Sequence, residues 1–120
     1  MEKMSLTALA RQQLALAHDA ASGRSSHTVY GGHEHVLRQT LIAMLAGQDL
    51  HEHENPGEAT VQVLQGRVRL SAGDVDWNGS PGDLLVVPGS KHSLAATEDS
   101  VVVLTVAKHE GRAGGGPAGA

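Results

Sequence analysis

Cysteine is absent from this chain of 120 residues, and so is phenylalanine. Without cysteine there is no disulfide, no thiolate metal site and no cysteine nucleophile, which excludes small disulfide-stapled domains and favours a cytoplasmic protein. Tyr30 and Trp77 are the only aromatic residues of the Phe, Trp and Tyr group. The core must therefore be built from Leu, Val, Ile and Ala, and few side chains are available for stacking on bases or sugars.

Basic clusters and long apolar runs are also absent. Nine Lys and Arg residues stand singly against thirteen Asp and Glu residues, and the formal net charge is -4. This distribution disfavours nucleic acid as a partner. No apolar run reaches the roughly 20 residues of a membrane helix, and the polar run 11–13 interrupts the first twenty positions, unlike a signal-peptide core. We expect no membrane partner.

The N-terminal segment has the apolar spacing of a helix over about 5–22. Its apolar positions are Leu6, Ala10, Leu14, Ala17 and Ala21, with Ser5 placed to cap the start and Gly23 to end the helix. The other positions of the helix are mostly polar, so its apolar stripe is predicted to cover a hydrophobic face or to form a subunit contact. His18 is expected to lie in solvent.

After Gly23, short segments rich in Val, Leu and Thr alternate with Gly, Asn, Asp and Pro, which is typical of an antiparallel β-domain. Strands are expected near 26–30, 36–45, 49–53, 58–65, 67–72, 75–78, 83–87, 91–96 and 100–107. Segments 84–87 and 101–104 are apolar throughout, so we expect both their faces to be covered, by the opposing sheet and by the helix or a second subunit.

Three segments follow from these patterns. Residues 1–24 form a helical segment, residues 25–109 form an all-β barrel, and residues 110–120 form a glycine-rich tail. The tail has too little apolar surface to order itself and is expected to be disordered.

Eight histidines are the chemical feature of the sequence. His51 and His53 stand two apart in a predicted strand, where they would share a face about 6.6 Å apart and could both reach one ion. The alternative is a polar strand end. His92 follows a second predicted strand and the loop 88–91.

These segments resemble the two sequence motifs of the cupin superfamily, G-x5-H-x-H-x3,4-E-x6-G and G-x5-P-x-G-x2-H-x3-N. The matching positions are His51, His53, Glu58 and Gly66 for the first motif and Gly82, Pro88 and His92 for the second. The resemblance covers about residues 36–107. It implies a small single-domain antiparallel jelly-roll barrel, also called a double-stranded β-helix, carrying an N-terminal helix, and a homodimer.

The match departs from the family pattern around the acidic position. Counting forward from His53 places the ligand at Glu58, whereas counting back from Gly66 places it at Ala59. The alternation of the following strand favours Ala59. A bulge between residues 54 and 60 would restore Glu58 to the site. In addition, the loop after Pro88 is one residue short, position 96 is Ala where the motif has Asn, and Gly47 stands too close to His51.

The resemblance implies a metal site made of His51, His53 and His92, with Glu58 as a fourth ligand or a general base. Imidazole ligands without thiolates suit Zn, Fe, Mn, Ni or Cu ions and do not distinguish among them. The expected function is binding of a small polar or anionic molecule in the barrel, as in a dioxygenase or isomerase. The alternatives are a non-catalytic ligand-binding or sensor cupin, a barrel whose pocket holds no ion, and a purely structural dimerising barrel.

Two further patterns stay open. His33 and His35 repeat the His-x-His spacing, either as a second chelate or as an exposed pair at a barrel edge, and the exposed pair is expected. Arg38 and Thr40 stand two apart in a predicted strand and should share a face. The sequence does not say whether that face is the inner one.

Overall fold

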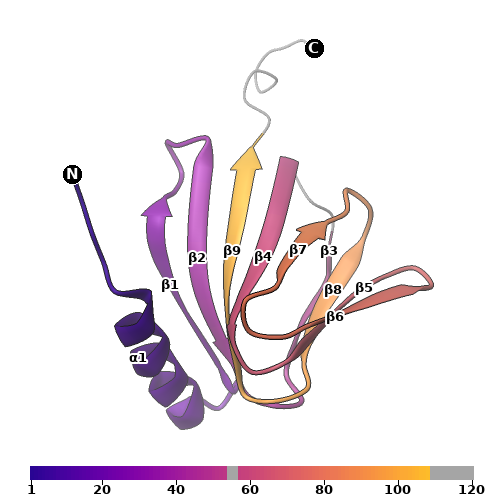
Figure 1. Ribbon diagram of the computed structural model, residues 1–120, viewed down its shortest axis with the longest axis horizontal. Coiled ribbons are helices and arrows are strands. Elements are labelled where there is room, and N and C mark those ends of the chain that lie inside the picture. Colours follow the sequence, from indigo (N-terminus) through magenta and orange to yellow (C-terminus); the bar gives the residue numbers. More distant parts are fainter. Residues whose placement is uncertain (54–56, 109–120) are drawn as a thin grey trace.

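The computed structural model describes residues 1–53 and 57–108, without the side chains of residues 51–53. The tail predicted at 110–120, and His109, lie outside the described residues. The described chain forms one helix followed by nine strands (Figure 1). They are α1 (Leu6–Asp19), β1 (Arg24–Gly31), β2 (Leu37–Met44), β3 (Asp49–His53), β4 (Gly57–Gln65), β5 (Val68–Ala72), β6 (Val75–Gly79), β7 (Leu84–Val87), β8 (His92–Ala96) and β9 (Ser100–Lys108).

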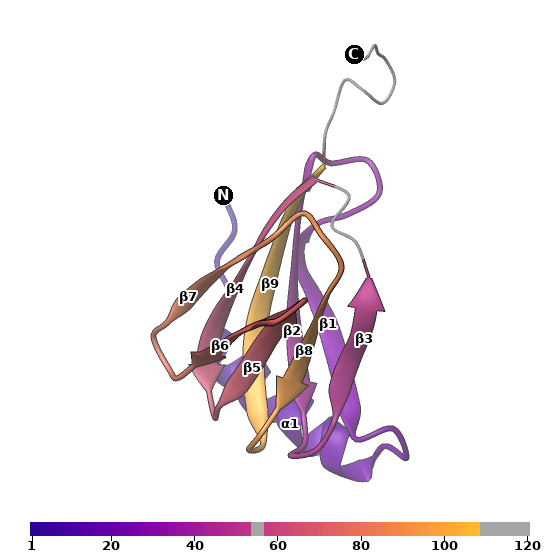
Figure 2. The same ribbon diagram turned by 90° about the vertical axis from the view of Figure 1, so that its right-hand side faces the viewer.

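The strands form two antiparallel sheets. One has the order β1-β2-β9-β4-β7 and the other the order β3-β8-β5-β6. Figure 2 shows the smaller sheet in front of the larger one. No strand ladder joins the two sheets within the described residues, so the expected barrel is observed as two facing layers. The inner face of each sheet is the one turned toward the other sheet, and the outer face is the one turned away from it.

Period-two alternation places the core between the sheets. On β2, Ile42 and Met44 belong to the inter-sheet core, while Leu41 and Ala43 belong to a second cluster on the outer face. Strand β9 alternates in the same way, so the apolar segment 101–104 is covered by the opposing sheet on one face and by α1 on the other. This part of the prediction is confirmed.

Helix α1 packs on the outer face of the larger sheet, against β1 and β2 (Figure 1). The Ser5 side chain accepts a hydrogen bond from the Ala8 N–H at 3.1 Å, as expected of an N-cap. The helix ends at Asp19, three residues earlier than predicted, because Ala20 is already extended. Gly23, with φ +68°, instead serves the turn into β1. No described helix is long and apolar enough to cross a membrane.

Within this chain, segment 84–87 has the predicted cover on one face only, and cover of its other face by a second subunit stays a prediction. Strand β7 is the last strand of its sheet, so its outer face has no covering helix. Leu85 and Val87 are buried, but Leu84 and Val86 are 60% and 75% exposed. On the neighbouring edge strand β6, Val75 and Trp77 are exposed as well. These four exposed side chains, Val75, Trp77, Leu84 and Val86, form what we call the β6–β7 surface.

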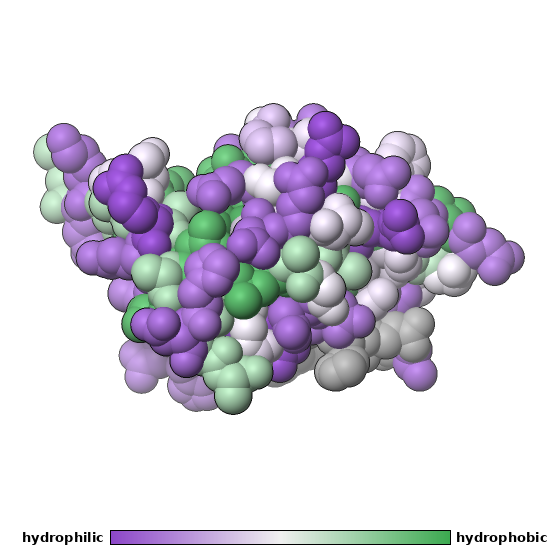
Figure 3. Space-filling model, turned by 90° about the horizontal axis from the view of Figure 1, so that it is seen from below, coloured by the Kyte–Doolittle hydropathy of each residue, from purple (hydrophilic) through white to green (hydrophobic). Residues whose placement is uncertain are grey.

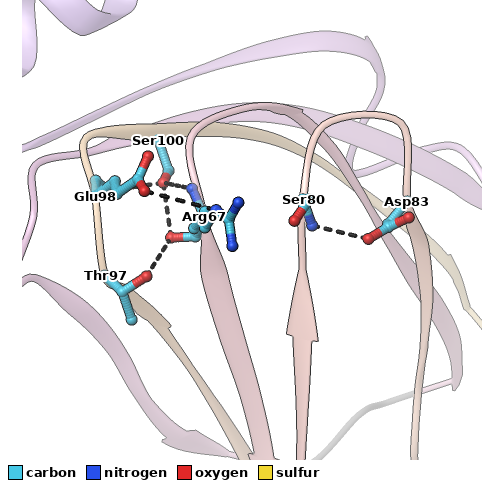
Figure 4. Close-up of polar contacts among 6 residues, drawn as sticks. All are labelled: Arg67, Ser80, Asp83, Thr97, Glu98 and Ser100. Atoms are coloured by element: carbon cyan, nitrogen blue, oxygen red, sulfur yellow. Dashed lines mark hydrogen bonds and ion pairs between the residues drawn. The ribbon is translucent and has the colours of Figure 1, made fainter.

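Polar contacts tie the turns together at the end opposite the C-terminus of β9. The buried Ser100 hydroxyl accepts from the Arg67 N–H at 3.0 Å, and the Ser80 N–H donates to Asp83 (Figure 4). Viewed from this end, hydrophilic and hydrophobic residues are interspersed over the surface (Figure 3). The predicted histidine site lies toward the other end, where β3 finishes and β8 begins.

Candidate metal and ligand site

His92 is the first residue of β8, and it is 6% exposed. It alternates with the buried Leu94 and Ala96, so its side chain lies on the inner face. Its Nδ1 lies 2.9 Å from the Ser90 carbonyl oxygen. A carbonyl can only accept, so Nδ1 of His92 carries a proton and donates this hydrogen bond. A backbone carbonyl bond of this kind is the usual way of orienting a histidine that binds a metal.

The register between β3 and β8 places His53 opposite His92. Leu50 stands opposite Leu94, so residues 51 and 52 together face a single residue of β8. This is a β-bulge, in which one extra residue interrupts the alternation of the strand. Positions 50 and 53 are therefore three residues apart on β3, while their partners on β8 are only two apart. The ladder does not pair His51. The side chains of residues 51–53 are not described, so the shared face of His51 and His53 stays a prediction.

A small cavity lies beneath His92 between the sheets. Its walls are apolar apart from this histidine, and its volume is about 20 Å³. The lining residues are Ile42, Leu50, Val61, Leu70, Val87, His92, Leu94 and Leu104. We call it the His92 cavity. A space of this size is enough for about one water molecule. A small-molecule ligand must therefore bind above this cavity or beside it.

Glu58 is not placed with His92. On β4, Ala59, Val61 and Val63 are buried in the core, while Glu58 is exposed on the opposite face, where it lines an outer hollow with Thr60, Val86 and Thr105. From 57 to 63 the ladder with β9 is regular. A bulge that would turn Glu58 inward is therefore absent from 57–60, the described part of the range 54–60. The ligand assignment of Glu58 is corrected, and Ala59 occupies the inward position.

No group of three or more His, Cys, Asp or Glu residues able to hold a metal is found among the described side chains. The predicted ligands His51 and His53 lie outside that set. His33 and His35 are exposed in the turn between β1 and β2, and the His35 ring contacts Tyr30 edge-on with centroids 5.5 Å apart. His18 is exposed, as expected, and its Nε2 lies 3.3 Å from a carboxylate oxygen of Asp99.

The inner face of the larger sheet becomes polar toward β1. Arg38 pairs with Val106, and Thr40 pairs with Leu104, so both residues share the face of the core residue Ile42. This decides the orientation that the sequence left open. Thr40 and Ile42 also line a hollow together with Arg24. Arg24 was not predicted as a site residue, because nothing in the sequence around it marks it as inward.

No protein-family model matches the chain, and no curated protein matches it. Solved structures do resemble it. The conserved SPY1581 protein of Streptococcus pyogenes, of unknown function, has a TM-score of 0.68 and 27% identity, covering 76% of this chain and 79% of that one. An RmlC-like cupin protein from Desulfovibrio desulfuricans has a TM-score of 0.61 and 27% identity, covering 70% and 81%. The chain folds as a small cupin domain.

A cupin superfamily protein from Desulfitobacterium hafniense DCB-2 shares the fold at 21% identity, with a TM-score of 0.65 over 71% of this chain and 77% of that one. In this cupin domain, the second histidine of the first motif and the histidine of the second motif stand opposite each other in one ladder. The acidic position of the first motif is taken by an inward alanine. The resemblance found in the sequence is thus confirmed for the fold, and it is incomplete in its ligand set.

Proposed function

We propose that this cupin domain binds a divalent transition metal ion through His51, His53 and His92 and uses the site to bind a small polar or anionic molecule. The observation that carries the proposal is the register that sets His53 opposite the buried His92. Residues directly opposite in an antiparallel ladder have Cβ atoms about 4.5–5.5 Å apart, a spacing that suits two imidazoles on one ion.

The residues fit such an ion in their chemistry. The hydrogen bond from Nδ1 of His92 to the Ser90 carbonyl orients the ring, as is common for a histidine that binds a metal through its other nitrogen. With three histidines and no inward carboxylate, the donor set would be neutral and would leave open coordination positions. When bound, the ion would supply Lewis-acid polarisation of an oxygen on the bound molecule. Zn, Fe, Mn, Ni and Cu all accept imidazole ligands.

A second function, binding or sensing without turnover, is favoured by the composition of the cavity. Apart from His92, the described lining of the His92 cavity holds no group that can donate or accept a proton. Catalysis as a dioxygenase or isomerase would require acid–base groups close to the reacting atoms. Oxygen uptake and isomerisation assays on metal-loaded protein, with small acids and diketones as substrates, separate the two functions.

The test of the metal site is the metal content of protein purified without a histidine tag. Inductively coupled plasma mass spectrometry should find about one ion per chain in the wild type and much less in His51→Ala, His53→Ala and His92→Ala. His27→Ala, on an exposed position of β1, and Glu58→Gln, on the outer face, should keep the ion. Thermal unfolding of each variant identifies any loss of fold. A wild type that carries no ion and takes none up contradicts the proposal.

We also propose that the protein is a homodimer. Support comes from the β6–β7 surface, where large apolar side chains are exposed on the edge strands of both sheets. Contiguous exposed apolar residues of this kind commonly mark contact surfaces between proteins. The cytoplasmic location stays a prediction from the absence of cysteine, and cell fractionation would test it.

A further inference from the structure

A hollow of about 230 Å³ lies between β1, β2 and β3, beside the predicted metal site. Its lining residues are Arg24, Ser25, Ser26, Thr40, Ile42 and Leu50, and we call it the β1–β3 groove. Ile42 and Leu50 also line the His92 cavity, so the groove and the cavity share a wall. The groove is therefore a space adjoining the His92 cavity that is large enough for a small organic molecule.

Arg38 stands next to this groove, beyond its lining residue Thr40. It is two residues from Thr40 on the same face of β2, toward the end where β8 begins. In the ladders of the larger sheet, Arg38 pairs with Val106, Val106 pairs with Ala59, and Ala59 pairs with Val87. Val87 lines the His92 cavity. Arg38 thus stands at the level of the cavity wall, and it is exposed to solvent.

The charge of the inner face favours an anion. Among the strand residues whose side chains the structure describes, the inner-face positions carry Arg24, Arg38 and Lys108 and no Asp or Glu. Acidic strand residues such as Asp49, Glu58 and Asp76 fall on outer faces. The inner face toward β1 is therefore positively charged, and a carboxylate bound there would meet no like charge from the described strands.

Two of these three cations already have partners. Arg24 donates from Nη1 to the Asp49 carbonyl oxygen at 2.7 Å, and the Lys108 ammonium donates to the Gly32 and His33 carbonyl oxygens. The Arg38 side chain makes no hydrogen bond or ion pair within the part of the chain that the structure describes. Its guanidinium is planar and offers paired N–H donors, which match the two oxygens of a carboxylate.

We propose that the β1–β3 groove binds a small organic acid and that Arg38 recognises its carboxylate. The hydroxyl of Thr40 and the apolar side chains of Ile42 and Leu50 suit a short carbon chain with polar substituents better than an inorganic ion. The volume is below the roughly 300–1,000 Å³ of drug-sized sites, which limits the ligand to a small molecule. This proposal deepens the proposed function and rests on it, since it names the class of molecule held beside His92.

The test is calorimetric titration of the full chain, stripped of metal with EDTA, with acetate, succinate and citrate. Succinamide, which lacks the charge, and inorganic phosphate, which lacks the carbon chain, serve as control ligands. At least one of the acids should bind saturably, and Arg38→Gln should weaken its binding by about tenfold or more, as expected for a lost charge-assisted hydrogen bond. Arg38→Lys should retain part of the affinity, because it keeps the charge without the paired donors.

Arg11→Gln is the matched control, since it removes the same charge from an exposed position on α1, outside the groove. It should bind the acid as the wild type does, and unfolding curves should show that Arg38→Gln remains folded. The proposal is overturned if none of the acids binds, if phosphate or succinamide binds equally well, or if Arg38→Gln and Arg11→Gln have the same affinity. Metal content is measured separately, so a metal-binding protein that ignores organic acids would defeat this inference and leave the metal proposal intact.

Discussion

Ser100 is the buried hydroxyl on which the turn between β4 and β5 depends. It is fully buried, accepts from the Arg67 N–H at 3.0 Å and donates to the Glu98 carbonyl oxygen at 2.7 Å. Gly66, the residue before Arg67, has φ +82°. A Cβ on Gly66 would lie 2.2 Å from the Asp99 carbonyl oxygen and 2.3 Å from the Ser100 hydroxyl. Glycine at 66 and serine at 100 are thus required by the same close approach of two turns.

Replacing Ser100 by Ala should lower the free energy of unfolding by about 0.5–1.5 kcal/mol, because the Arg67 N–H loses its acceptor in a partly buried hydrogen bond. Ser93→Ala, at a half-buried outer position of β8, should change it by less than about 0.5 kcal/mol. Urea denaturation followed by circular dichroism measures both. Equal effects of the two substitutions would show that the Ser100 hydrogen bonds contribute nothing specific.

At the scale of elements, α1 is held by both its cap and its packing. Ala17 is completely buried on the outer face of the larger sheet, and the Ser25 hydroxyl donates to the side-chain oxygen of the buried Gln13. The first turn depends on Ser5, which accepts from the Ala8 N–H. The helix is thus a covering layer of the fold, and it contributes no residue to the candidate site.

Ser5→Ala should destabilise the protein by about 0.5–2 kcal/mol, since one of the first N–H groups of α1 loses its acceptor. Ser5→Asp should restore most of this, because aspartate caps equally well and its charge suits a helix N-terminus. The measurement is the midpoint of urea unfolding. An alanine variant as stable as the wild type would mean that the helix end is already open in solution.

At the scale of the whole molecule, the two sheets leave apolar side chains exposed where β6 and β7 lie at their edges. Val86 lines three adjoining hollows, of about 310, 320 and 350 Å³, so this surface offers both a ridge and recesses. A twofold interface needs one surface that is complementary to itself, and a surface with both features can meet that need. The predicted homodimer is therefore expected to form here.

Val86→Lys should convert a dimer into a monomer, because it would place a charge in the middle of the apolar contact. Leu16→Lys, at a position that is 52% exposed on α1, should leave the dimer intact. Size-exclusion chromatography with multi-angle light scattering gives the mass of each protein. A wild type that is monomeric at high micromolar concentration, or a dimer that survives Val86→Lys, would contradict the predicted interface.

The local sequence was enough to predict the elements of this cupin domain. The strands expected at 36–45 and 100–107 are observed as Leu37–Met44 and Ser100–Lys108, and the helix begins where Ser5 predicts. Hydrophobic alternation and turn glycines are properties of a few neighbouring residues, so a single chain reveals them. The cupin resemblance could be found in the same way, because its motifs are read as spacings along the chain.

The orientation of the site residues was decided by tertiary structure alone. Position 53 stands opposite His92 because β3 bulges against β8, Glu58 turns away because β4 runs regularly beside β9, and Arg38 lies on the inner face because β2 pairs with β9. A shift of one residue in strand pairing moves every side chain to the other face. That pairing depends on partners distant along the chain, so spacing alone did not determine which side chains meet at the site.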